Sequence, residues 1–170
     1  MLIIAAIVIL VLIGIDQAIK IWAIQELKPV GSMDFLHIGD FDIMDLTYLE
    51  NTGSAFGSFA GHRVLLLTVT IIGAAACIWI LIRHAQKKPF LFWSLVLVIA
   101  GGLGNMIDRI FRGGAVVDYL DLQLFDFAIF NFADCCVSVG TVLLFIYIIF
   151  MMDKKPKETK TDEEVTDGTA

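Results

Sequence analysis

Four aspartates lie in the short stretch VVDYLDLQLFDFAIFNFAD, residues 116 to 134, of a chain whose neighbouring segments are strongly apolar. They are Asp118, Asp121, Asp126 and Asp134. Two aspartates that share one proton can hydrolyse an amide, because one activates a water as general base while the other polarises the carbonyl. Asp134 opens an apolar run and is expected near a helix N-terminus, where free N–H groups favour its charged form and a neighbouring carboxylate keeps the proton. The residues alone do not say which carboxylate that neighbour is.

Other catalytic groups show no supporting pattern. The chain contains three cysteines and three histidines, Cys77, Cys135, Cys136, His37, His62 and His84. The cysteines have neither metal-ligand nor disulfide spacing, so we interpret them as small buried apolar residues. The histidines are dispersed and no motif surrounds them, so a Ser-His or Cys-His nucleophile is not indicated. We expect no metal and no cofactor.

Long apolar runs must position these carboxylates. The chain of 170 residues is 58% hydrophobic and has a mean hydropathy of +0.84, more apolar material than a soluble domain requires. Three runs without a charge, 64–82, 89–107 and 135–152, each fit one membrane crossing. Residues 1–15 are also free of charge, and we interpret them as part of a fourth span because no basic residue precedes them and no small-x-small cleavage site follows.

We therefore expect an all-α membrane protein. It is a bundle of four transmembrane helices, at about 2–24, 64–82, 89–109 and 135–152, in one membrane-embedded domain over residues 1–152. The polar and charge-rich residues 153–170 cannot bury enough apolar area to fold and are expected to form a disordered cytoplasmic tail.

Basic residues orient this bundle. The link 83–88 holds three Lys and Arg residues and the tail holds four, so both are expected in the cytoplasm together with both termini. The outer segments 25–63 and 110–134 then face the extracytoplasmic side. The net charge of −6 sums an acidic outer surface and the tail, and it indicates no nucleic-acid partner.

The first outer segment alternates apolar residues with single polar residues or Gly between Phe35 and Leu49, which is typical of short strands. NTGSAFG at 51–57 then has turn chemistry. We expect a small extracytoplasmic β-sheet on the outer membrane surface. An ordinary loop is the alternative. A lid over a site there could come from this segment or from residues 111–129, with Gly113 and Gly114 as hinges.

Polar residues at membrane depth gather at one level. Asn105, Asp108 and Arg109 end the third span, and Asp16 and Lys20 lie on one face of the first at i and i+4. A charge at the bilayer centre costs roughly 2.5–3.5 kcal/mol, so we expect these groups to face the bundle interior. Snorkelling of the Asp108 and Arg109 pair to water is the alternative. With the aspartate that opens the fourth span, three helices place carboxylates in one layer, which predicts a buried polar site.

Five blocks of this sequence resemble, in order and in membrane position, the lipoprotein signal peptidases, also called signal peptidase II. The blocks are DQAIK at 16–20, NTGSAFG at 51–57, GGLGNMIDR at 101–109, VVDYLD at 116–121 and FNFAD at 130–134. The resemblance covers residues 1 to about 152. The departures from the family pattern are Ser54 and Gly102 for alanine, Tyr119 for phenylalanine, and Cys135 and Cys136 for serines.

The resemblance implies an aspartyl endopeptidase of the bacterial cell membrane. It implies removal of signal peptides from diacylglyceryl-modified prolipoproteins, by a cut on the amino side of the lipidated cysteine at the outer membrane face. Carried over by motif, the catalytic pair falls on Asp118 and Asp134. The positions that support the site or bind substrate are Asp16, Lys20, Asn51, Gly53, Asn105, Asp108, Arg109, Asn131 and Ala133. Membrane lipid and the inhibitor globomycin are the further partners implied, and we expect a monomer.

Two other functions stay open on the residues alone. A small proton-coupled transporter also places Asp, Asn and Arg inside a bundle, although it needs a polar path that inner helix halves such as LLFIYIIFMM do not offer. A non-enzymatic membrane assembly factor would not depend on any single carboxylate. An aspartyl protease of the presenilin or prepilin type would need a G-x-G-D block, which GGLGNMID is not.

Overall fold

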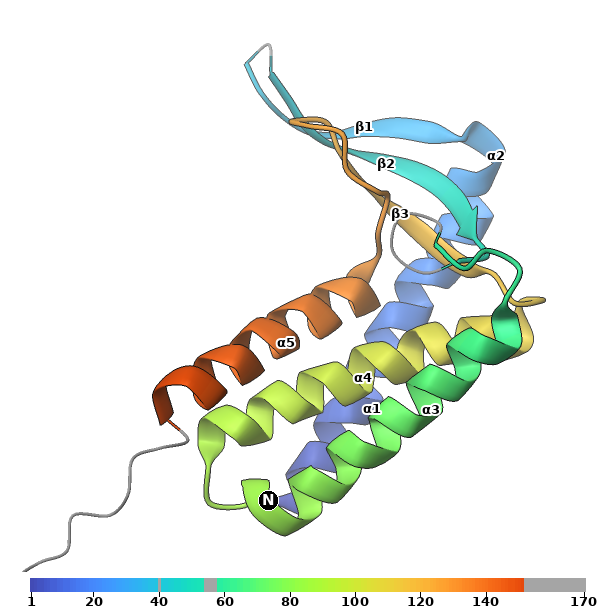
Figure 1. The fold of residues 1–170 in the computed structure, drawn as a ribbon. Helices are drawn as coiled ribbons and strands as arrows, with labels where there is room; N and C mark the ends of the chain where they lie inside the picture. The colour runs from blue at the N-terminus through green and yellow to red at the C-terminus, as the bar shows by residue number, and fades with distance from the viewer. Residues whose placement is uncertain (40, 54–57, 152–170) are drawn as a thin grey trace, which may run out of the picture.

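The computed structural model describes residues 1–39, 41–53 and 58–151. It consists of a bundle of long helices with a small sheet at one end, and the N-terminus lies at the opposite end of the bundle (Figure 1). The predicted tail 153–170 and the departure at Ser54 lie outside the described residues. The helices are α1 (Leu2–Trp22), α2 (Lys28–Val30), α3 (Arg63–Ile80), α4 (Pro89–Phe111) and α5 (Phe132–Met151), with π-helical turns η1 (Ala23–Leu27) and η3 (Leu81–Ala85).

Four helical stretches of the described chain are long and apolar enough to cross a membrane, which confirms the predicted class. They are 2–30, 63–85, 89–111 and 132–151. The first runs beyond the predicted residue 24 because η1 and α2 continue it, and it ends at Gly31, whose φ of 83° takes the chain into the left-handed region. The last begins at Phe132, three residues before the predicted start, because a capping pair precedes it.

The sheet has three antiparallel strands in the order β1-β2-β3, and the end of the bundle next to it is here called the outer end. Strands β1 (Ser32–Ile38) and β2 (Phe41–Asn51) form the hairpin that the alternating pattern predicts. Strand β3 (Val116–Leu122) was not predicted, and it pairs with β2 so that Asp118 lies opposite Leu49. Two of the four aspartates between residues 116 and 134, Asp118 and Asp121, are therefore held in the sheet.

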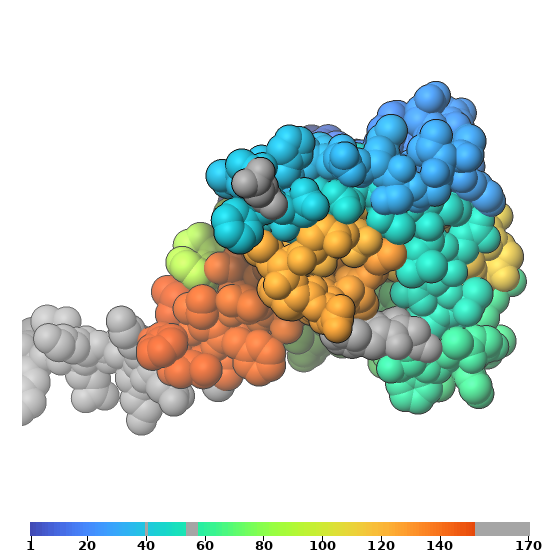
Figure 2. Space-filling model, turned by 90° about the horizontal axis from the view of Figure 1, so that it is seen from above, coloured from blue at the N-terminus to red at the C-terminus, as the bar shows by residue number. Residues whose placement is uncertain are grey.

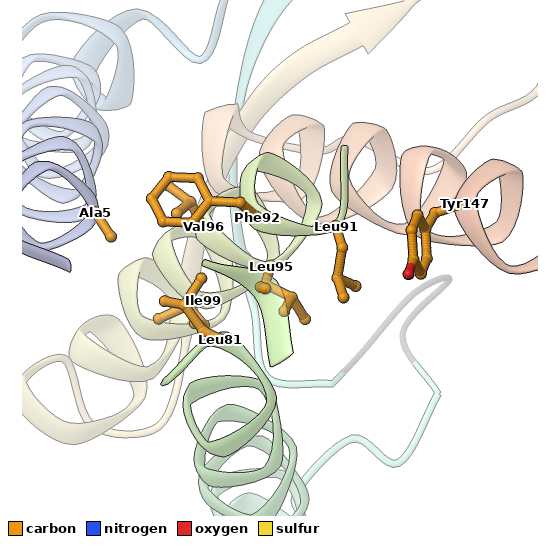
Figure 3. Close-up of a cluster of buried hydrophobic side chains, with 9 residues drawn as sticks. Ala5, Leu81, Leu91, Phe92, Leu95, Val96, Ile99 and Tyr147 are labelled. Atoms are coloured by element: carbon orange, nitrogen blue, oxygen red, sulfur yellow. The ribbon is translucent and has the colours of Figure 1, made fainter. Parts of the chain in front are cut away.

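Helix α4 is the centre of the bundle, because it packs against α1, α3 and α5. Its inner half carries Leu91, Phe92, Leu95, Val96 and Ile99 into one apolar cluster, which fills the space between the helices (Figure 3). Helices α4 and α5 approach closely at glycines. A Cβ atom on Gly140 would lie 2.8 Å from the carbonyl oxygen of Ser94, so this approach excludes any larger residue there.

A buried cluster of charges lies at the outer end of the bundle. Lys20 Nζ lies 2.9 Å from Asp16 Oδ2 and 3.0 Å from Asp108 Oδ2, and all three side chains are buried. Gln17 Nε2 donates to Asp108 Oδ1 at 3.0 Å, and Arg112 forms an ion pair with that same oxygen. Asp108 therefore faces the bundle interior, and the snorkelling alternative is wrong for it.

This ionic cluster joins separate elements. Asp16 Oδ1, on α1, accepts a hydrogen bond from the backbone N–H of Ala133 in the first turn of α5, at 3.1 Å. Asp108 Oδ2, on α4, accepts one from the N–H of Val117 in β3, at 3.2 Å. The cluster thus fixes the start of α5 and the start of β3, the two elements that carry the candidate catalytic residues.

Replacing Lys20 by Met should be strongly destabilising, because it leaves two buried carboxylates without their shared cation. Breaking a buried ion pair by removing one partner costs about 3–5 kcal/mol. We expect Lys20→Met to lower the free energy of unfolding by this amount, measured by thermal or denaturant unfolding in detergent micelles.

The matched control is Lys28→Met. Lys28 also pairs with a carboxylate, that of Glu50 at 2.6 Å, but both side chains are about half exposed, at 53% and 49%. Its removal should change stability far less, since exposed ion pairs contribute little. Equal losses in the two variants would contradict a stabilising role for the ionic cluster.

Candidate active site

Asp118 lies in β3 with its carboxylate buried. Its Oδ1 accepts a hydrogen bond from Asn131 Nδ2 at 2.6 Å and its Oδ2 accepts one from Asn51 Nδ2 at 3.0 Å. Burial raises the pKa of Asp118 from its ordinary value to about 6; the hydrogen bond from Asn51 opposes this rise and the nearby charge of Asp134 adds to it. Asp118 is therefore poised to hold a proton at a pH where most aspartates have lost theirs.

Asp134 lies in the first turn of α5 and is fixed by a capping box. Asn131 Oδ1 accepts a hydrogen bond from the N–H of Asp134 at 3.0 Å, and Asp134 Oδ2 accepts one from the N–H of Asn131 at 3.1 Å. The other carboxylate oxygen, Oδ1, accepts from Asn105 Nδ2 at 2.7 Å. Both oxygens of Asp134 are thus held, as are both oxygens of Asp118.

Two asparagines connect the pair to the ionic cluster. Asn131 is fully buried, and its Nδ2 lies within hydrogen-bond distance of both Asp118 Oδ1 and Asn105 Oδ1, at 2.6 and 3.1 Å. Asn105 Oδ1 also accepts from Lys20 Nζ at 2.9 Å. A continuous series of hydrogen bonds therefore runs from Lys20 to both carboxylates, and it fixes their relative positions.

The two carboxylates line one cavity of about 540 Å³, here called the dyad cavity. Its polar wall also includes Asn51, Asn105 and Arg109. The rest is largely apolar and comes from β3, the loop after it and the outer end of α5: Val116, Phe127, Ala128, Ile129, Phe130, Cys135, Val137, Ser138 and Val139. A cavity of this size and lining suits an extended, mostly apolar peptide segment.

Arg109 brings a positive charge to this cavity. Its Nη2 donates to the carbonyl oxygen of Gly53 at 2.8 Å, and the N–H of Gly53 donates to Asn51 Oδ1 at 2.9 Å. Its Nε is buried and has no hydrogen-bond partner among the described residues. Arg109 and Gly53 together hold the end of β2 beside the carboxylates, which positions Asn51 to bond Asp118.

The residues that sequence analysis selected fall into two groups. Those that line the dyad cavity or contact its carboxylates are Asp118, Asp134, Asn51, Asn105, Arg109 and Asn131, and Gly53 joins them through its hydrogen bonds with Asn51 and Arg109. Those in the ionic cluster behind it are Asp16, Lys20, Asp108 and Ala133, the last through its backbone N–H.

Sequence reasoning missed several parts of the site. Gln17 stands inside the quoted block DQAIK, yet its contact with Asp108 joins α1 to α4 and depends on the packing of the two helices. Arg112 follows Asp108 at i+4, a spacing that predicts an ion pair on a helix and was not used. The apolar wall from Phe127 to Phe130 had no recognisable pattern, because it is an irregular loop.

Comparisons with known proteins identify the family of this chain. The family model described as signal peptidase (SPase) II matches residues 8–150. The lipoprotein signal peptidase of Clostridium acetobutylicum is 40% identical over 153 residues, which cover 87% of this chain and 96% of that protein. The lipoprotein signal peptidase of Streptococcus pneumoniae is 38% identical over 146 residues, with 86% and 92% covered.

Two solved structures of bacterial membrane enzymes share the fold. One has a TM-score of 0.79 and 31% sequence identity, and the match covers 92% of this chain and 94% of that one. The other has a TM-score of 0.73 and 30% identity, with 86% and 93% covered. With the family model matching most of the chain, these findings show that the protein belongs to the signal peptidase II family of membrane peptidases.

Proposed function

We propose that this protein is an intramembrane aspartyl endopeptidase that removes signal peptides from diacylglyceryl-modified prolipoproteins. The cut falls on the amino side of the lipidated cysteine, at the outer membrane face. Membership of the lipoprotein signal peptidases supports the substrate class. The observation that carries the mechanism is the pair Asp118 and Asp134, which line one cavity with every carboxylate oxygen held by a hydrogen-bond donor.

The two carboxylates have different environments and hence different roles. Asp134 is charged and acts as general base, because the N-terminus of α5 favours negative charge. Asp118 holds the shared proton, in line with its burial and raised pKa. Asp134 takes a proton from water as the water oxygen bonds to the scissile carbonyl carbon, and Asp118 gives its proton to the carbonyl oxygen. Asp134 then protonates the leaving nitrogen, the C–N bond breaks, and Asp118 regains its proton.

The lining of the dyad cavity fits a substrate that arrives from the membrane. Val137 and Val139 line the cavity and belong to α5, a helix long and apolar enough to span the membrane. One side of the cavity therefore lies at the depth of the bilayer. A signal peptide presents its apolar helix there, and its scissile bond reaches the depth of the carboxylates. Globomycin, as a cyclic peptide, is proposed to occupy the same cavity.

The apolar cluster in the inner half of the bundle is evidence against a transport function. A transport path requires polar groups through the membrane, whereas Phe92, Leu95 and Ile99 fill the space between the described helices at that level. The buried charged and amide side chains of the described residues lie at the outer end of the bundle instead. Hydrolysis at the outer interface is the function that this distribution supports best.

The proposed orientation places the dyad cavity outside the cytoplasm and can be tested by reporter fusions. The basic link 83–88 is the reason to expect the cytoplasmic side for it. A reporter fused after Lys88 should read cytoplasmic, and one fused after Gly113 should read extracytoplasmic. The opposite pair of readings would place the cavity on the wrong side for a translocated precursor.

Asp118→Asn and Asp134→Asn should each abolish cleavage of a purified diacylglyceryl-modified precursor. Each change keeps the side-chain size but removes a carboxylate that the chemistry requires, so we expect a loss in kcat of at least about a thousandfold. The double variant should be no worse than either single variant, because the pair acts on one water as a unit. Mass spectrometry of the released lipidated product measures the cut.

Asp121→Asn is the matched control for these variants. Asp121 lies in the same strand as Asp118 but outside the dyad cavity, and it accepts a hydrogen bond from Thr47 Oγ1 at 2.9 Å that an Asn carbonyl can also accept. It should remain within about tenfold of the parent, a barrier change of about 1.4 kcal/mol. A folded Asp118→Asn protein that cuts at the parental rate would show that the wrong aspartate had been chosen.

The pH dependence of kcat/KM should report the proton on Asp118. Because the mechanism requires this proton, kcat/KM falls as pH rises through the pKa of Asp118, about 6 in the free protein. Asn51→Ala removes a hydrogen bond that favours the charged carboxylate, which raises the pKa of Asp118 further. The alkaline limb of the profile should therefore move to higher pH in this variant.

The control for the pH profile is Cys135→Ser. Cys135 lines the dyad cavity next to Asp134 but none of the hydrogen bonds described for Asp118 involves it. The alkaline limb of the Cys135→Ser profile should keep the midpoint of the parent, even if the rate changes. A limb that moves to lower pH in Asn51→Ala would mean that the titrating group is not Asp118.

A further inference from the structure

A second cavity of about 540 Å³ adjoins the dyad cavity and is here called the outer pocket. The two share the residues Asn51, Phe127, Ala128 and Ile129, so they are separated only by this common wall. None of the proposed catalytic steps uses the outer pocket. Its remaining lining is Leu49, Glu50, Thr52, Gly53, Ala60 and Asp126.

The two cavities differ in the elements that line them. The dyad cavity includes residues of the spanning helices α4 and α5, whereas the described lining of the outer pocket comes only from the end of β2, the turns after it and the loop after β3. Seen from the sheet end of the molecule, that loop, drawn in orange, lies beside β2 (Figure 2). The outer pocket therefore adjoins the dyad cavity away from the described spanning helices.

The charges around the outer pocket are unequal. Glu50 is neutralised, because its Oε1 accepts hydrogen bonds from Lys28 Nζ at 2.6 Å and from Tyr48 Oη at 2.8 Å. Asp126 is exposed and forms no ion pair within the described residues. The guanidinium of Arg109 lies on the side of the dyad cavity and donates a hydrogen bond to the carbonyl oxygen of Gly53. The uncompensated charge of the outer pocket is thus the negative charge of Asp126.

We propose that the outer pocket binds the residues that follow the lipidated cysteine of the substrate, and that Asp126 makes this pocket prefer basic over acidic side chains there. The inference rests on the proposed function, since it assigns the substrate segment on the carboxyl side of the cut. That segment belongs to the mature lipoprotein and leads away from the membrane. The proposed preference therefore concerns substrate residues that take no part in the hydrolysis itself.

The expected size of the preference follows from exposure. A single exposed charge pair changes an affinity by up to about fivefold, and salt screens it. We therefore expect a two- to fivefold effect in kcat/KM at low ionic strength, mainly through KM. At about 1 M salt, where the screening length is about 3 Å, the preference should largely disappear.

The experiment compares two lipidated precursors that differ only in the three residues after the cysteine, which carry one lysine in the first and one glutamate in the second. The quantity measured is the ratio of their kcat/KM values. The parent protein should prefer the lysine precursor, Asp126→Asn should bring the ratio close to one, and Asp126→Lys should reverse it. Because the readout is a ratio, a general loss of activity or of folded protein does not imitate the effect.

Asp34→Asn is the matched control, since it removes the same charge from the sheet region but outside both cavities. Asp34 is exposed on the edge strand β1, which β2 separates from β3, and it does not line the outer pocket. Its ratio should equal that of the parent. A parental ratio near one, or a ratio that Asp126→Asn leaves unchanged, overturns the specificity while cleavage itself still stands, whereas a protein that cuts neither precursor refutes the proposed function.

Discussion

The architecture of the site depends on one buried cation, Lys20, held between the carboxylates of Asp16 and Asp108. A charge without a partner is expensive at this depth, so the cluster is stable only when complete. The two positive side chains, Lys20 and Arg112, form ion pairs with the two negative ones, Asp16 and Asp108, so the net charge of the cluster is zero. Because the carboxylates also accept hydrogen bonds from backbone N–H groups of α5 and β3, the same electrostatic balance sets the positions of these two elements, which carry the proposed catalytic residues.

The amide side chains of Asn105 and Asn131 connect the ionic cluster to Asp118 and Asp134, and they add no charge. Asn105 accepts from Lys20 and donates to Asp134, and Asn131 donates to Asp118 while capping α5. An amide can donate and accept at once, which a lysine or a carboxylate cannot do. A charged group in either place would bias the proton that the two aspartates are proposed to share toward one of them. Asparagine fixes the geometry, so the position of the proton depends on the local environment of each carboxylate.

The sequence predicted those parts of the fold that depend on local pattern. Uninterrupted apolar runs predicted the helices, and alternation between Phe35 and Leu49 predicted the β1-β2 hairpin. Strand β3 was missed because its first four residues are all buried, so the alternation that marks a half-exposed strand is absent. The bond between Asn51 and Asp118 depends on the register of β2 and β3, which no local pattern specifies. The resemblance, rather than spacing, paired Asp118 with Asp134.

The start of α5 shows how a cap combines structure and chemistry. Counting charge-free residues placed this start at Cys135, whereas the pattern N-x-x-D in NFAD indicates a cap at Asn131. The cap puts Asp134 on the first turn, where the sheet region and the apolar wall of Val137 and Val139 meet in one cavity. Hydrolysis of a membrane-anchored peptide requires water and an apolar substrate at the same carboxylates. The first turn of a spanning helix suits a residue that must serve both, because the apolar run follows it and the sheet region precedes it.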